Sequence, residues 1–167
     1  VWIAGYDGKF TTEVYCPDIS GILPSVKIVP ADFFYGTAGS TDTWILFGNC
    51  QYSLIQGLDD LPQNEKLTLS RMIQGIQDKK EIVRILYHYM QDHTRYINVS
   101  MDIGGLKPYP ASYVSQNKYG DCKALTNYMK ALLNHAGIRS YYTLVYAGTQ
   151  PRGIMEDFPS QQFNHVI

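Results

Sequence analysis

The sequence has little that is typical of a nucleic-acid-binding or membrane protein. Its 167 residues carry 14 Lys and Arg against 15 Asp and Glu, for a net charge of −1. No basic run exceeds Lys79-Lys80, which gives no surface suited to a phosphate backbone. Charged residues, Pro or Gly interrupt every apolar run before the roughly 18 residues that a membrane span needs. We therefore expect neither a nucleic-acid partner nor membrane insertion.

Cysteine and cofactor motifs are also scarce. Cys16, Cys50 and Cys122 form an odd set without CxxC or zinc-ligand spacing, so neither a dense disulfide framework nor a zinc module is indicated. The sequence has no GxSxG, HExxH, P-loop or GxGxxG motif, so the commonest hydrolase, metalloprotease and nucleotide-binding signatures are absent. His88 and Asp92 are four apart on a predicted helix, but two ligands are too few for a metal site. We expect no cofactor and no metal.

Two units are predicted along the chain. Residues 1–29 favour strands and turns but are too few to bury a core, so we interpret them as a linker or a remnant of a preceding β-rich domain. Residues 30–167 form the second unit. Its last segment, 162–167, has the pattern of a strand with no turn after it, and we interpret the chain as a piece of a longer protein.

Periodic apolar residues and capping residues predict four helices. The first is capped by Thr41-Asp42 and ends near Gly57, the second covers about 65–76, and Asp78 caps the third. The third has a wide apolar stripe that favours packing against a sheet. The fourth begins after Asp121 and ends at Gly137.

The remaining segments are predicted as extended or irregular. Residues 95–99 form a short extended piece, and 102–120 contain so many Gly and Pro residues that we expect an irregular loop over a site. Strands are predicted over 138–146 and from about 163.

Cys122 is the strongest candidate for a nucleophile. It follows Gly120-Asp121 and occupies the first turn of the predicted fourth helix. The unpaired N–H groups and the positive end of the helix dipole there favour thiolate over thiol, and they also face an oxyanion formed when the sulfur attacks a carbonyl. His165, on the last predicted strand, is a candidate for the base that holds the thiol proton. A buried apolar Cys and a structural His are the alternative interpretation.

Three blocks carry a family resemblance. The order is a Gly-Asp-Cys helix start, a Leu-rich helix ending in Gly-Ile, and an Asn-His-Val strand, at residues 119–125, 132–138 and 163–166. This order resembles the core of the transglutaminase-like superfamily. Further segments resemble a bacterial subgroup in which this core follows a β-rich domain of unknown function: residues 23–27, 30–36, 95–96 and 104–108.

The resemblance implies an α+β fold with a papain-like core, in which the nucleophile helix packs on an antiparallel sheet that is truncated at the C-terminus. It implies Cys122 as nucleophile and His165 as base and acid, with the orienting acidic residue expected beyond Ile167. The backbone N–H of Cys122, Gln116, Tyr96 and Tyr119 are candidates for the oxyanion site or the cleft.

The implied activity is acyl transfer from an amide through a Cys122 thioester. The enzyme would be a cysteine peptidase, an amidase or a transglutaminase, with a peptide, protein or glycopeptide as substrate. The alternative is an inactive domain that binds peptide or carbohydrate through Tyr109, Tyr113 and Tyr119. Members of the subgroup are commonly exported, which implies a periplasmic or cell-surface location. The sequence does not define the oligomeric state.

Overall fold

The computed structural model describes residues 14–15, 26–98, 105–148 and 153–167. Within these ranges lie five helices and three two-stranded sheets. No helix in the described ranges is long and apolar enough to cross a membrane. Most of the predicted β-rich unit at residues 1–29 lies outside the described residues, as does Val99 of the predicted extended piece.

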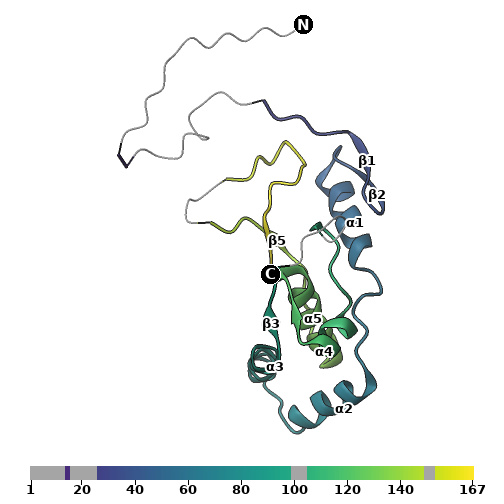
Figure 1. Ribbon diagram of the computed structural model, residues 1–167, viewed down its shortest axis with the longest axis vertical. Coiled ribbons are helices and arrows are strands. Elements are labelled where there is room, and N and C mark those ends of the chain that lie inside the picture. The colour runs from purple at the N-terminus through teal and green to yellow at the C-terminus, as the bar shows by residue number, and fades with distance from the viewer. Residues whose placement is uncertain (1–13, 16–25, 99–104, 149–152) are drawn as a thin grey trace, which may run out of the picture.

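A helical core surrounds α5 (Cys122–His135). Figure 1 shows α5 with α3 (Lys79–His93) and α4 (Ala111–Asn117) close beside it, and both helices contact it. α2 (Gln63–Met72) contributes Leu69 to the same core. Several side chains of α5 and of the helices packed on it are almost fully buried: Tyr128 and Leu132 of α5, and Leu69, Leu86 and Val114. The core therefore fixes α5 on several sides.

Local sequence signals explain both ends of α5. The Asp121 side chain caps the first turn, accepting a hydrogen bond from the backbone N–H of Ala124 at 2.9 Å. At the other end Gly137 has φ +69°, a left-handed conformation that glycine adopts at helix ends without steric strain. Both predicted ends of this helix are confirmed.

A β-hairpin and α1 (Trp44–Ile55) lie at the N-terminal side of the described chain (Figure 1). β1 (Asp32–Phe34) pairs antiparallel with β2 (Ala38–Ser40), and Phe33 lies opposite Gly39. A Cβ added to Gly39 would meet the Phe33 ring at 2.5 Å and Cys50 Sγ at 2.7 Å. The glycine thus lets the ring of Phe33 pack between the hairpin and α1. This hairpin was not predicted from the sequence.

Two further strand pairs flank the start of α5. β3 (Arg95–Tyr96) is parallel to β4 (Tyr119–Gly120), and β5 (Leu144–Val145) is antiparallel to β6 (His165–Val166). The predicted strands at 138–146 and 163–167 are therefore present but shorter than expected. The predicted α+β fold class is confirmed.

Three helix predictions need correction. α1 is capped by Thr43, whose side chain accepts from the N–H of Leu46, and not by Thr41-Asp42. α2 ends at Met72 instead of Ile76, because the chain turns into Gly75 at φ +80°. The apolar stripe of α3 packs mainly on α5, so its partner is a helix and not a sheet.

The prediction of an irregular loop over 102–120 is wrong for its second half. α4 occupies 111–117 and β4 follows it. Pro110 stands at the N-cap of α4 with φ −56°, a position where a missing N–H costs no hydrogen bond. No Gly or Pro follows until Gly120, so no helix-breaking residue lies within α4.

Candidate active site

Cys122 is the first residue of α5 and directly follows β4. Asp121 is 2% exposed and Lys123 is 7% exposed, and Lys123 Nζ lies 2.5 Å from Asp121 Oδ2. Asp121 therefore both caps the helix and neutralises a buried ammonium group. Cys122 itself is half-buried with a free thiol, held between two residues that are fixed by this ion pair.

Gly120 is required by the close approach of β4 to the first turn of α5. A Cβ at this position would lie 2.8 Å from the Cβ of Ala124, a distance at which the backbone must shift. The glycine of the Gly-Asp-Cys block thus sets the position of the turn that carries Cys122.

We expect Gly120→Ala to destabilise the protein by about 1–3 kcal/mol and to change the alkylation rate of Cys122. Gly48→Ala is the matched control, because an added Cβ there meets nothing within 4 Å and alanine favours a helix. Thermal unfolding of both variants checks the prediction. Equal stability of the two variants would contradict it.

His165 is carried by β6, opposite Val145 of β5. Asn164 fixes the start of this strand through two hydrogen bonds with Ala147: its amide donates to the carbonyl at 2.9 Å and its oxygen accepts from the N–H at 2.7 Å. Thr126 of α5 donates to the carbonyl of Val166 at 3.3 Å. These bonds place β6 beside α5.

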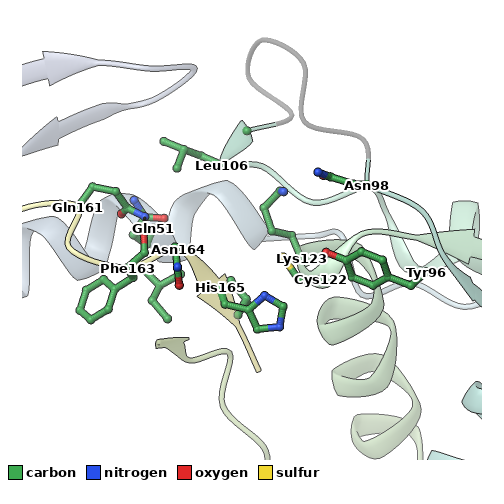
Figure 2. Close-up of a pocket in the computed structure, with 13 residues that line it drawn as sticks. Gln51, Tyr96, Asn98, Leu106, Cys122, Lys123, Gln161, Phe163, Asn164 and His165 are labelled. Atoms are coloured by element: carbon green, nitrogen blue, oxygen red, sulfur yellow. Dashed lines mark hydrogen bonds between the residues drawn. The ribbon is translucent and has the colours of Figure 1, made fainter. Parts of the chain in front are cut away.

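Cys122 and His165 line two adjoining pockets. We call the first the central pocket; it has a volume of about 230 Å³, and Figure 2 shows His165 and Cys122 on its wall. The second, the aliphatic pocket, measures about 420 Å³. Both pockets share Tyr96, Cys122, His165 and Val166. In the described chain, no hydrogen bond joins the thiol to the imidazole, and no residue bonds to the His165 ring.

Tyr96 lies beside Cys122, and both residues line the two pockets. The pKa of Tyr96 is raised, first by partial desolvation of its hydroxyl and then by the nearby Cys122 thiol. The N–H of Ile97 donates to the carbonyl of Gly120 at 2.9 Å and holds β3 beside β4. The sequence analysis placed Tyr96 among the cleft candidates, and it lines both pockets.

Tyr142 is a neighbour that the sequence analysis did not identify. Its hydroxyl is buried and has no hydrogen-bond partner in the described chain. Burial raises the pKa of this phenol, and Cys122 and Asp121 are near enough to raise it further. The sequence shows only that Tyr142 lies in a segment rich in β-branched and aromatic residues. This pattern does not determine which way the Tyr142 side chain points.

Two of the predicted cleft residues lie elsewhere. Gln116 is exposed on α4 and lines none of the pockets described here. The Tyr119 hydroxyl hydrogen-bonds with that of Tyr113, and Tyr119 also lines neither pocket. Tyr113 and Tyr109 stack with ring centroids 4.4 Å apart. These tyrosines form an aromatic cluster around α4, separate from the central pocket.

No metal centre is formed by the described residues, in which no group of three or more His, Cys, Asp or Glu side chains comes together. His88 and Asp92 are both exposed on α3. His93 hydrogen-bonds with the carbonyl of Tyr89 at 2.8 Å, and His135 with Ser70 Oγ at 2.9 Å. The first bond lies within α3, and the second joins α5 to α2.

A cysteine at the start of a core helix, with a histidine strand beside it, defines a fold of the papain-like type. Residues 67–166 match the family model of the transglutaminase-like superfamily, and the chain belongs to this superfamily. A crystal structure of a "putative protease" from Parabacteroides distasonis is similar in fold, with a TM-score of 0.52 and 18% identity. The match covers 70% of this chain and 23% of that protein. No curated protein matches the sequence.

Proposed function

We propose that the protein is a thiol-dependent acyl-transfer enzyme in which Cys122 attacks an amide carbonyl and His165 moves the proton. The observation that carries the proposal is the position of Cys122 on the first turn of α5, in a pocket that His165 also lines. Membership of the transglutaminase-like superfamily supports it.

The reaction proceeds in two stages. The Cys122 thiolate forms a bond to the carbonyl carbon, and the carbonyl electrons move to oxygen. When that oxyanion collapses, the C–N bond breaks, and the His165 imidazolium gives its proton to the departing amine. A thioester remains. Neutral His165 then takes a proton from water or from a second amine, which attacks the thioester and frees Cys122.

The first-turn N–H of Cys122 is the donor that we assign to the oxyanion. Tyr96 lies beside Cys122 and lines both pockets, so its hydroxyl is our candidate for a second donor to the same oxyanion.

Water as the second substrate makes the protein a cysteine peptidase or amidase, and an amine makes it a transglutaminase. We favour hydrolysis of a peptide, protein or glycopeptide, as in the bacterial subgroup that the sequence resembles. We also propose an acidic residue on a later strand that orients His165, a preceding β-rich domain of which residues 1–29 are a linker or remnant, and a periplasmic or cell-surface location.

Alkylation by iodoacetamide, mapped by mass spectrometry across a pH series, tests the proposed pair. We expect Cys122 to react at least about tenfold faster than Cys50 near neutral pH. Cys50 is an internal control, because burial raises the pKa of its thiol and keeps it protonated to higher pH. His165→Ala is expected to slow the reaction of Cys122 and leave Cys50 unchanged.

His88→Ala is the matched control for loss of an imidazole, since His88 is exposed on α3 and lines neither pocket. It should leave the alkylation profile of Cys122 unchanged. If His165→Ala and His88→Ala give the same profile as the unmodified protein, His165 does not act on Cys122, and the binding module becomes the better proposal.

A further inference from the structure

A third hollow adjoins the central pocket. We call this hollow the hairpin pocket; it measures about 300 Å³ and is lined by Phe33 and Phe34 of β1 among others. It shares Gln51, Leu106 and Gln161 with the central pocket, and none of these three residues lines the aliphatic pocket. We call the two adjoining hollows together the groove; Cys122 and His165 line its central-pocket part.

Uncharged amide side chains line the middle of this groove. They are Gln51, Asn98, Gln161 and Asn164, which Figure 2 shows around the central pocket. Among the described residues that line the central pocket, the one ammonium group is that of Lys123, which is paired with Asp121. No described residue hydrogen-bonds with the Gln51 side chain, which is half-buried where the two hollows meet. The Asn164 amide is bonded at both ends to Ala147, and Gln161 Nε2 donates to the carbonyl of Phe163. The Gln51 amide and the Gln161 oxygen can therefore pair with the N–H and C=O groups of a peptide backbone.

The hairpin pocket differs in chemistry from the central pocket. Its wall is mostly apolar and aromatic, formed by Val29, Pro30, Phe33, Phe34, Tyr35, Phe47 and Leu106. Phe34 is 77% exposed, and its ring therefore has apolar surface available to a ligand. A pocket of this kind binds a bulky apolar side chain.

We propose that the hairpin pocket is a specificity subsite for a large apolar side chain of a polypeptide substrate, whose backbone lies along the amide-lined groove toward Cys122. The inference rests on the proposed function and adds the substrate class: an extended, uncharged peptide segment with an aromatic or large aliphatic residue at a fixed distance from the bond attacked. The polar central pocket suits the peptide backbone, and the apolar hairpin pocket suits the large side chain.

Peptide binding to the Cys122→Ala protein tests the subsite without turnover. The probes are N-acetylated, C-amidated octapeptides of Gly and Ser, in which one Phe is moved through every position. Amide chemical shifts of the labelled protein report the dissociation constant. We expect one Phe position to strengthen binding about tenfold, as burial of a phenyl ring does, and Phe34→Ala to remove that gain.

Ile45→Ala is the matched control. Ile45 is 75% exposed on α1 and lines none of the three pockets, so the gain should persist in this variant. The proposal is overturned if no Phe position strengthens binding, if Phe34→Ala and Ile45→Ala act alike, or if chitohexaose shifts the groove resonances and the octapeptides do not. Binding is measured on a protein without the Cys122 thiol. A negative result would therefore overturn the subsite proposal, whereas the proposed function is tested separately by alkylation.

Discussion

Asp121→Ala is expected to lower the free energy of unfolding by about 4 kcal/mol. Removing the carboxylate leaves the ammonium of Lys123 buried without its partner, and loss of one partner of a buried ion pair costs about 3–5 kcal/mol. The same change removes the cap of α5, since Asp121 accepts from the N–H of Ala124, at a cost of about 1 kcal/mol. Thermal and denaturant unfolding measure the total.

Two further variants separate these contributions. Asp121→Asn keeps a capping oxygen and loses the charge, so we expect it to retain the helix cap and still lose most of the ion-pair contribution. Adding Lys123→Met to Asp121→Asn removes the unpaired charge and should recover much of the stability. If Asp121→Asn is as stable as the unmodified protein, the buried pair does not contribute as argued.

The effect should reach the candidate site as well. Cys122 lies between the two members of the ion pair, and its position on the first turn depends on the cap. We therefore expect Asp121→Ala to slow alkylation of Cys122 under conditions where the protein is still folded. The double variant Asp121→Asn with Lys123→Met keeps the cap and has no unpaired buried charge. Its Cys122 should react nearly as fast as that of the unmodified protein.

Features of the fold that are set by residues close together in the sequence could be predicted. The α5 cap at Asp121, its end at Gly137 and the Asp78 cap of α3 were all readable, because a cap acts within three residues of the helix start. The β1–β2 hairpin was not predicted, since its packing depends on Gly39 meeting Phe33 and Cys50 and not on a strong local turn signal.

In the candidate site, too, some residues could be predicted from the sequence and others could not. Cys122, His165 and Tyr96 were identified from the sequence and lie around one pocket. Gln51 and Tyr142 were not, because they come from segments whose approach to Cys122 is set only by packing. Gln116 was chosen by its spacing from Cys122, but α4 turns it outward, since residue spacing does not determine the direction of a side chain.

The buried carboxylate of Glu65 was also not predicted from the sequence. Glu65 is 4% exposed, and its Oε1 accepts hydrogen bonds from the hydroxyls of Tyr128 and Tyr89, the latter at 3.1 Å. Its Oε2 has no partner among the described residues. Because Glu65 is on α2, Tyr89 on α3 and Tyr128 on α5, one side chain joins three helices of the core.

We expect Glu65→Ala to destabilise the protein by about 3 kcal/mol, because two hydroxyls lose a charged acceptor and hydrogen bonds to charged groups contribute about 1.5–3 kcal/mol each. Glu65→Gln keeps an acceptor oxygen and should cost less. Urea unfolding of the two variants at neutral pH compares them. Equal losses would mean that the carboxylate is stabilising through its packing alone.

The same cluster predicts a loss of stability at alkaline pH. Burial first, and then the charge and hydrogen bond of Glu65, raise the pKa of Tyr89 to about 12, and burial raises that of Tyr128 as well. Unfolded tyrosines release their protons near pH 10, so above that pH the folded protein holds more protons than the unfolded chain. Stability is then complete below about pH 10 and declines as the pH approaches the folded pKa of Tyr89.

Ultraviolet absorbance of tyrosinate, followed against pH, measures these phenols directly. In Glu65→Gln the negative charge is gone, and Tyr89 should ionise at a lower pH than in the unmodified protein. Tyr142→Phe is the control, since the raised pKa of Tyr142 arises from burial and from Cys122 and Asp121. It should remove one late-titrating phenol and leave the others in place. A titration unchanged by Glu65→Gln would show that burial alone sets the acidity of Tyr89.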